Sequence, residues 1–290
     1  MIEVGRVARP GRHHRDASDD AVQALNYAAT VAAATKTLLQ LVYVADDTVV
    51  NSAWGVVFDG SDVQSSARRL LAEAAGVAHS LGVAKRRIQT KVAVGTPVGV
   101  LTQLSQHCSM VVVGRRANSG HSHQFSGSTA VGLAASVRCP LVVVAEGRSH
   151  PQGPIGVALD PAGPGVGALQ WVLSNPLYTG RPVRVVSVCK APQSRIFRSS
   201  VTQQQIDAAI AQTVTAQAAL IKRVLAEHFD PPPITTEVRY GSPVDELASF
   251  SEGVSLLVLE PVVRFPTYSI GSTARGMMTY ASCPVLLVKA

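Results

Sequence analysis

The same short motifs occur twice in this 290-residue chain, in the same order and 144 to 146 residues apart. The paired motifs are Asp16 and Asp160, Gly95-Thr-Pro-Val and Gly241-Ser-Pro-Val, Gly127-Ser-Thr and Gly271-Ser-Thr, and Cys139-Pro140 and Cys283-Pro284. Ordered motifs at a nearly constant offset indicate a tandem duplication. We therefore expect two domains, residues 1–148 and 149–290, joined by the Gly/Pro/polar stretch 146–154.

Apolar strand-like runs alternate with helix-like runs in both copies. In the first copy we expect strands at 38–44, 88–94, 110–113 and 141–144, and helices at 19–34, 62–81, 97–106 and after Gly127. In the second copy we expect strands at 155–159, 183–188, 234–240, 256–259 and 285–288, and helices at 164–173, 202–229, 243–250 and 272–281. This alternation predicts an α/β fold in which helices cover both faces of a parallel sheet. Each copy is thus expected to be a doubly wound domain that binds ligands beyond the carboxyl ends of its strands.

The first strand of the first copy breaks the pattern. A clean apolar strand leads into Asp160, whereas RPGRHHR precedes Asp16. Such a run cannot form a buried central strand, because proline lacks the N–H and the charged side chains resist burial. Two alternatives follow: residues 2–7 supply the strand and a basic loop comes next, or the first sheet is damaged. We favour the first alternative.

The segment 110–145 has the spacing of a phosphate site. A strand-like run ends at Gly114, Gly127-Ser128-Thr129 opens a helical stretch, and Pro140 ends it. A helix start of this kind offers free backbone N–H groups, two hydroxyls and the positive end of the helix dipole to an anion. Serine or threonine at a helix start is also an ordinary N-cap. Taken alone, the segment fits either a phosphate site or a cap.

Composition excludes several classes of protein. Hydrophobic residues make up 47% of the chain, which excludes disorder, and no apolar run approaches the ~20 residues of a spanning helix. The N-terminus lacks a signal-peptide core, so we expect a cytoplasmic protein without a membrane partner. The four cysteines form no CxxC pair, and we expect reduced, buried thiols rather than a metal site or disulfides.

The net charge of +7 lies mainly in the first copy, with +5 in residues 1–148 and +2 in residues 149–290. Such a balance suits nucleotide phosphates or nucleic acid. Aromatic residues are only 5% and no basic run is interleaved with them, so we do not expect a nucleic-acid partner. The sequence also contains no Ser-His-Asp context, HExxH, complete Walker A loop or metal-ligand spacing, so no catalytic residues are predicted.

These motifs together resemble a tandem universal stress protein, an arrangement common in actinobacteria. Nucleotide-binding members of that family carry Gly, two residues, Gly, nine residues, then Gly followed by Ser or Thr. Here Gly114, Ala117 and Gly127-Ser128 follow that spacing, with alanine in place of the second glycine. Asp16-Ala-Ser18 is similar to the family's Asp-x-Ser, and Tyr27-Ala28-Ala29 is similar to its aromatic-Ala-Ala.

The resemblance implies five parallel strands per domain in the order 3-2-1-4-5, with ATP or AMP in the crevice and ATP, with or without magnesium, as the expected cofactor. It places Asp16 near the ribose or adenine and the Val44 backbone at the base. The loop residues Gly114 and Ala117 would approach the phosphates, and Gly127, Ser128 and Thr129 would hold them.

The second copy departs further from the family pattern. Its strand ends at Glu260-Pro261, and 10 residues instead of 12 precede its Gly-Ser-Thr motif. A carboxylate and a proline there oppose an anion and hinder close backbone approach. We therefore expect at most a weaker second site, formed by Asp160, Gly271, Ser272 and Thr273.

Three functions are compatible with these observations. The first is a stress-response regulatory protein that binds ATP in its first domain. The second is a nucleotide-free interaction and dimerisation module. The third, slow ATP hydrolysis, is the weakest, because no general base is identifiable. The resemblance also implies a homodimer paired through the last strands of the domains, 141–144 and 285–288, together with a protein partner of unknown identity.

Overall fold

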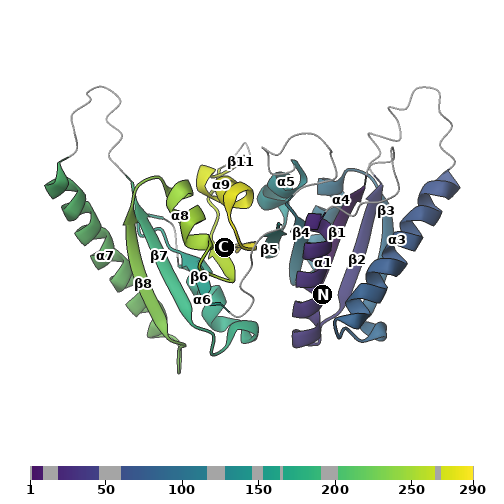
Figure 1. The fold of residues 1–290 in the computed structure, drawn as a ribbon, viewed down its shortest axis with the longest axis horizontal. Coiled ribbons are helices and arrows are strands. Elements are labelled where there is room, and N and C mark those ends of the chain that lie inside the picture. The colour runs from purple at the N-terminus through teal and green to yellow at the C-terminus, as the bar shows by residue number, and fades with distance from the viewer. Residues whose placement is uncertain are drawn as a thin grey trace, which may run out of the picture. The chain divides into compact units, whose positions relative to one another are not determined.

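The computed structural model describes residues 2–8, 19–45, 60–115, 128–145, 153–163, 166–190, 202–264 and 269–289. The chain forms two compact units (Figure 1). Unit 1 comprises Met1–Glu146 with Val263–Ile270, and unit 2 comprises Gly147–Val262 with Gly271–Ala290. None of the helices among the described residues is long and apolar enough to cross a lipid bilayer.

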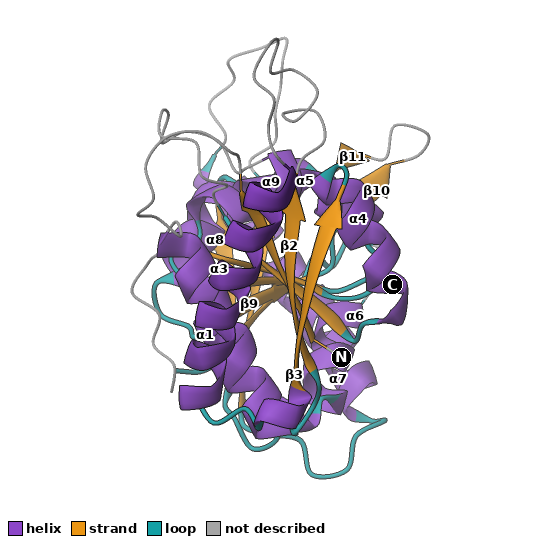
Figure 2. Cartoon of the chain, turned by 90° about the vertical axis from the view of Figure 1, so that its right-hand side faces the viewer, coloured by secondary structure: helices purple, strands orange, loops and turns teal. Residues whose placement is uncertain are grey.

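The sheet of unit 1 has five parallel strands in the order β3-β2-β1-β4-β5. The strands are β1 (Ile2–Ala8), β2 (Leu39–Ala45), β3 (Ile88–Val94), β4 (Met110–Gly114) and β5 (Leu141–Val144). The helices are α1 (Asp19–Thr35), α3 (Gly60–Ser80), α4 (Pro97–Leu104) and α5 (Ser128–Ser136). Figure 2 shows α1 and α3 on one side of β2 and β3, with α4 on the other. This is the doubly wound order 3-2-1-4-5 that the family resemblance implied.

Unit 2 repeats this order as β8-β7-β6-β9-β12, again with parallel pairs. Its strands are β6 (Ile155–Ala158), β7 (Val183–Cys189), β8 (Ile234–Tyr240), β9 (Leu256–Leu259) and β12 (Val285–Leu287). Its helices are α6 (Gly167–Ser174), α7 (Gln203–Leu225), α8 (Pro243–Ser251) and α9 (Ser272–Tyr280). The central strands β4 and β9 are buried on both faces, as the continuous apolar runs predict.

Residues 2–8 supply the first strand of unit 1, which confirms the favoured alternative. β1 pairs with β2 along its whole length and with β4 from Ile2 to Gly5. The alternative of a damaged first sheet is therefore wrong. The basic run before Asp16 lies outside the described residues.

The duplication is visible in the details of packing as well as in the strand order. Gly132 of α5 and Gly276 of α9 face Val98 and Val244, and a Cβ on either glycine would lie 2.7 Å from a valine methyl. Each unit also uses a serine at the end of the helix before its fourth strand to accept a backbone N–H. Ser105 Oγ accepts from Arg138 at 3.3 Å, and Ser251 Oγ accepts from Ser282 at 2.8 Å. These matched contacts follow the same offsets as the sequence motifs.

Two expectations from the sequence need correction. The helix expected over 202–229 ends at Leu225, with Ala226 as its C-cap. Pro231, which has no N–H to continue a helix, follows shortly after. None of the four cysteines forms a disulfide, but only Cys139 and Cys283 are buried, while Cys108 and Cys189 are partly exposed. The short strands β10 (Val263–Arg264) and β11 (Ser269–Ile270) form an antiparallel pair that the sequence pattern did not reveal.

Candidate functional site

Doubly wound sheets bind ligands at the carboxyl ends of the strands, where the strand order reverses. In unit 1 that point lies between β1 and β4. Of the predicted nucleotide-binding residues of the first copy, the structure describes all atoms of Val44, Gly114 and Thr129 and only the backbone of Ser128. Asp16, Ala117 and Gly127 lie outside the described residues.

Val44 is the next-to-last residue of β2. It stands beside Val7 of β1 and Ala93 of β3 in the parallel ladder. The whole residue, backbone included, is 0% exposed. The backbone contact with the base that the resemblance implies stays a prediction.

Gly114 ends β4 in close contact with the start of α1. A Cβ on Gly114 would lie 3.0 Å from the carbonyl carbon of Asp20 and 3.2 Å from the amide nitrogen of Ala21. Only glycine fits so near to backbone atoms, so the packing of α1 against β4 already accounts for this residue. Its expected role near phosphate is an addition to this structural one.

Helix α5 begins at Ser128, where the Gly-Ser-Thr motif predicted a helix start. Its first turn contains no acidic residue, and Thr129 is half-buried. The contact between Gly132 and Val98 and a 2.7 Å hydrogen bond between the hydroxyls of Thr102 and Ser136 hold the helix on α4. The position of the helix start is therefore determined by packing along the rest of the helix.

In unit 2 a carboxylate occupies the corresponding contact between strand end and helix start. Glu260 corresponds to Gly114, 146 residues earlier, and Gly167 lies at the start of α6, two residues after the position that matches Ala21. The N–H of Gly167 donates to Glu260 Oε2 at 3.0 Å, at the start of α6. A negative charge at a helix N-terminus is favourable because it opposes the helix dipole. The chain's own carboxylate thus fills a place that would otherwise attract an anion.

The remaining predicted residues of the second copy are also engaged within the chain or lie in the open. The N–H of Gly271 donates to the Val262 carbonyl at 3.0 Å. Asp160 is exposed, and its Oδ1 accepts the Ala162 N–H at 3.0 Å in a local turn. Ser272 is exposed and Thr273 half-buried at the start of α9.

Sequence reasoning did not foresee the hydrogen bond between Glu260 and Gly167. The match of Glu260 with Gly114 was the only clue in the sequence, and it points to a helix start only once the closeness of Gly114 to Ala21 is known. Among the described residues, no group of three or more His, Cys, Asp or Glu side chains could hold a metal ion.

Comparison with known proteins agrees with the duplication. The model of the universal stress protein family matches residues 15–145 and again residues 153–289. No curated protein matches the chain.

Solved structures share the two-unit fold along nearly the whole chain. A universal stress protein from Archaeoglobus fulgidus DSM 4304 has a TM-score of 0.63 and 14% identity, covering 99% of this chain and 96% of that one. A functionally unknown protein from Pseudomonas aeruginosa PAO1 has a TM-score of 0.59 and 14% identity, covering 99% and 92%. At such identities the likeness shows the fold alone. Because the family model matches both halves, this chain belongs to the universal stress protein family and carries two copies of its domain in tandem.

Proposed function

We propose that unit 1 binds ATP at the carboxyl ends of β1 and β4, and that the bound nucleotide regulates the protein. Membership of the universal stress protein family supports a role in the stress response. In this proposal AMP is the alternative nucleotide, and magnesium accompanies ATP through its phosphates rather than through a protein metal site.

The start of α5 is the observation that carries this proposal. It follows Gly127 directly, begins with two hydroxyl residues and has no acid in its first turn. Free N–H groups and the helix dipole at such a start favour a phosphate. The packing of Gly132 on Val98 keeps this helix start in place without any ligand, so the binding groups would be preorganised.

The proposal includes further contacts at the carboxyl ends of the strands. Gly114 leaves the end of β4 free of a side chain, and the Val44 backbone lies near the end of β2. In the proposal Asp16 binds the ribose or adenine side, Ala117 lies in the phosphate loop, and the motif residues Gly127, Ser128 and Thr129 hold the phosphates.

The two copies provide a matched experiment. Gly127→Glu places a carboxylate at the start of α5, and Gly271→Glu makes the same change at the start of α9. A Cβ at Gly271 would have only ordinary contacts, the nearest being 3.6 Å from the Val262 carbonyl oxygen. We expect Gly127→Glu to weaken ATP binding at least tenfold in isothermal titration calorimetry, about 1.4 kcal/mol or more. Gly271→Glu should leave the affinity unchanged.

Circular dichroism and thermal unfolding of both variants serve as the folding controls. Wild-type protein that binds no ATP at millimolar concentration contradicts the proposal. Equal loss of affinity in the two variants contradicts the assignment to unit 1. Mass spectrometry of any ligand released from the purified protein distinguishes ATP from AMP.

For unit 2 we favour an interaction role, because backbone N–H groups that could bind a phosphate already donate to oxygens of the chain. The N–H groups of Gly167 and Gly271 both donate to oxygens of the chain. We infer that unit 2 binds no nucleotide and supports the interaction role of the protein. Two equivalents of ATP per chain in the titration contradict this inference, and one equivalent that disappears in Gly127→Glu supports it.

A further inference from the structure

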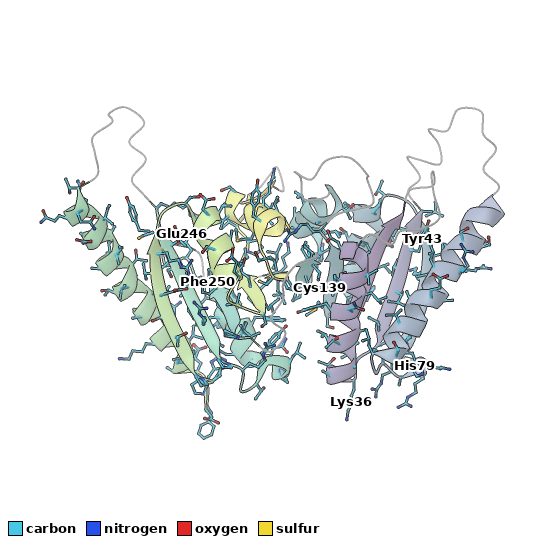
Figure 3. The ribbon with its side chains drawn as sticks, in the orientation of Figure 1. Lys36, Tyr43, His79, Cys139, Glu246 and Phe250 are labelled. Atoms are coloured by element: carbon cyan, nitrogen blue, oxygen red, sulfur yellow. The ribbon has the colours of Figure 1, made fainter. Side chains whose placement is uncertain are left out.

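Four cations gather at the amino ends of β2 and β3, at the opposite end of the strands from the proposed nucleotide site. Lys36 lies in the turn before β2, and Lys85, Arg86 and Arg87 form the short 3₁₀ helix before β3. Figure 3 shows Lys36 and His79 at one end of unit 1 and Tyr43 of β2 toward the other. We call Lys36, Lys85, Arg86 and Arg87 the basic end of unit 1.

The two loops that carry these residues lie side by side. β2 and β3 are hydrogen-bonded neighbours that begin in register, with Leu39 opposite Ile88. A Cβ on Gly82, in the loop before β3, would lie 3.7 Å from the Cβ of Ala33 in the last turn of α1. Lys36 follows three residues after Ala33, so the four cations share one end of the unit.

Among the side chains that are described, few acidic groups oppose this charge; Glu3 of β1, which pairs with Gln40 of β2 at the same end of the sheet, is described by its backbone alone. Asp20 and Glu73 are the acidic residues of 19–145 whose side chains are described; Asp20 is buried, and Glu73 lies two turns before the end of α3. Within the part of the chain that the structure describes, the four cations take part in no ion pair. Lys36, Lys85 and Arg86 are exposed and Arg87 is partly so.

The second copy shows that the fold does not require these cations. Its corresponding residues are Gly180 for Lys36 and Pro231, Pro232 and Pro233 for Lys85, Arg86 and Arg87. Gly180 and Lys36 both have positive φ angles, +73° and +53°. Glycine adopts this backbone conformation without strain, so lysine at position 36 lowers the stability of the fold relative to glycine.

Unit 2 does have a cation near this place, but it is used internally. Arg181 donates from Nη2 to the Gly153 carbonyl and, at 2.8 Å, to Ser255 Oγ. Among the described side chains, the cations of the basic end have no such partners, and Lys36, Lys85 and Arg86 are exposed to solvent.

Exposed aliphatic side chains accompany the charge. Val77, in the last turn of α3, is 41% exposed, and Leu81, just after that helix, is 40% exposed. A nucleic-acid backbone offers no apolar surface for these aliphatic groups. Among the described residues of unit 1, none of the exposed large apolar side chains is aromatic, so none could stack on a base. Clustered cations beside exposed aliphatic groups are typical of proteins that rest on an anionic lipid surface.

We propose that the basic end of unit 1 docks the protein on membranes through anionic phospholipid headgroups, with Leu81 and Val77 reaching the apolar boundary. The proposal concerns the amino ends of the strands and is independent of nucleotide binding. It revises the expectation of no membrane partner, which rested on the lack of a spanning segment.

Vesicle co-sedimentation of the full chain tests this docking. The probes are phosphatidylcholine vesicles with and without phosphatidylglycerol, at low and high salt. We expect binding only with phosphatidylglycerol, with loss at high salt because the charges are exposed. Arg86→Gln/Arg87→Gln should lower the partition coefficient about fivefold per cation removed. Arg68→Gln/Arg69→Gln, in the first half of α3, makes the same change in charge outside the basic end and should leave binding near the wild-type value.

The variant Leu81→Gln distinguishes membrane binding from nucleic-acid binding by the basic end. It should weaken vesicle binding, whereas binding of a duplex DNA probe to the same surface would be insensitive to it. Three results overturn the proposal: no binding to phosphatidylglycerol vesicles at low salt, equal losses in the two double arginine variants, or DNA binding that exceeds vesicle binding and is unaffected by Leu81→Gln. Thermal unfolding confirms that each variant is folded.

Discussion

Single residues at corresponding places in the two copies have different tasks. Lys36 and Gly180 occupy turns of the same hand, but only the glycine is suited to that backbone. Gly114 and Glu260 both end a strand against the start of a helix, but only Glu260 places a carboxylate there. Because the fold around the two positions is nearly the same, each pair allows the effect of one residue to be compared between the two units.

Lys36→Gly should raise the free energy of unfolding by about 0.5 to 1 kcal/mol, since it relieves the left-handed conformation of a residue with a Cβ. Gly180→Ala is the converse change, and nothing lies within 4 Å of its new Cβ, so any loss of stability comes from the backbone. We expect a loss of similar size. Urea unfolding measures both values, and a destabilised Lys36→Gly variant would show that the lysine has a structural role.

Glu260→Gln should lower the free energy of unfolding by about 0.3 to 1 kcal/mol, because the charge at the start of α6 is lost while an oxygen remains to accept the Gly167 N–H. Glu252→Gln, at an exposed position just after α8, is the control and should stay within about 0.5 kcal/mol of wild type. Urea unfolding at low ionic strength gives the comparison. Equal effects of the two changes would contradict the importance of the helix start.

At the scale of elements, the packing of the helix before the fourth strand on the helix after it recurs in both units. Gly132 meets Val98 where α4 and α5 touch, and Gly276 meets Val244 where α8 and α9 touch. In unit 1 this contact also holds the proposed phosphate-binding helix against α4. In the proposed function, Gly132 therefore links helix packing with phosphate binding.

Gly132→Ala should destabilise unit 1 by about 1 to 3 kcal/mol, because its Cβ would come within 2.7 Å of a Val98 methyl. Val98→Ala in the same chain should restore part of that loss by making room. A double-mutant cycle measured by urea unfolding gives the coupling between the two residues. Independent, additive effects would show that the contact is looser than the distance indicates.

At the scale of the whole molecule, two units of one fold are expected to respond differently to one ligand. A ligand that binds only the folded state stabilises it by RT ln(1 + [L]/Kd), about 2.7 kcal/mol at a hundredfold excess over Kd. Scanning calorimetry with ATP should therefore shift the unfolding of unit 1 upward and leave that of unit 2 in place. The shift should vanish in Gly127→Glu and persist in Gly271→Glu. An equal shift of both units would indicate two nucleotide sites.

The homodimer implied by the resemblance stays a prediction. Sedimentation velocity over a range of protein concentrations measures it directly. A single concentration-independent species of the mass of one chain would contradict it.

The amino-acid sequence by itself determined the duplication, the order of strands and helices and most element bounds, because apolar periodicity and proline or glycine punctuation are local properties. It also predicted the helix start at Ser128, which a short motif encodes. Tertiary structure alone decided what distant residues do to one another. It showed that Gly114 is needed by α1, that Glu260 binds the start of α6, and that Lys36 joins Lys85, Arg86 and Arg87 at one end of unit 1. These are contacts between segments far apart in sequence, and only the strand register and the helix packing bring such segments together.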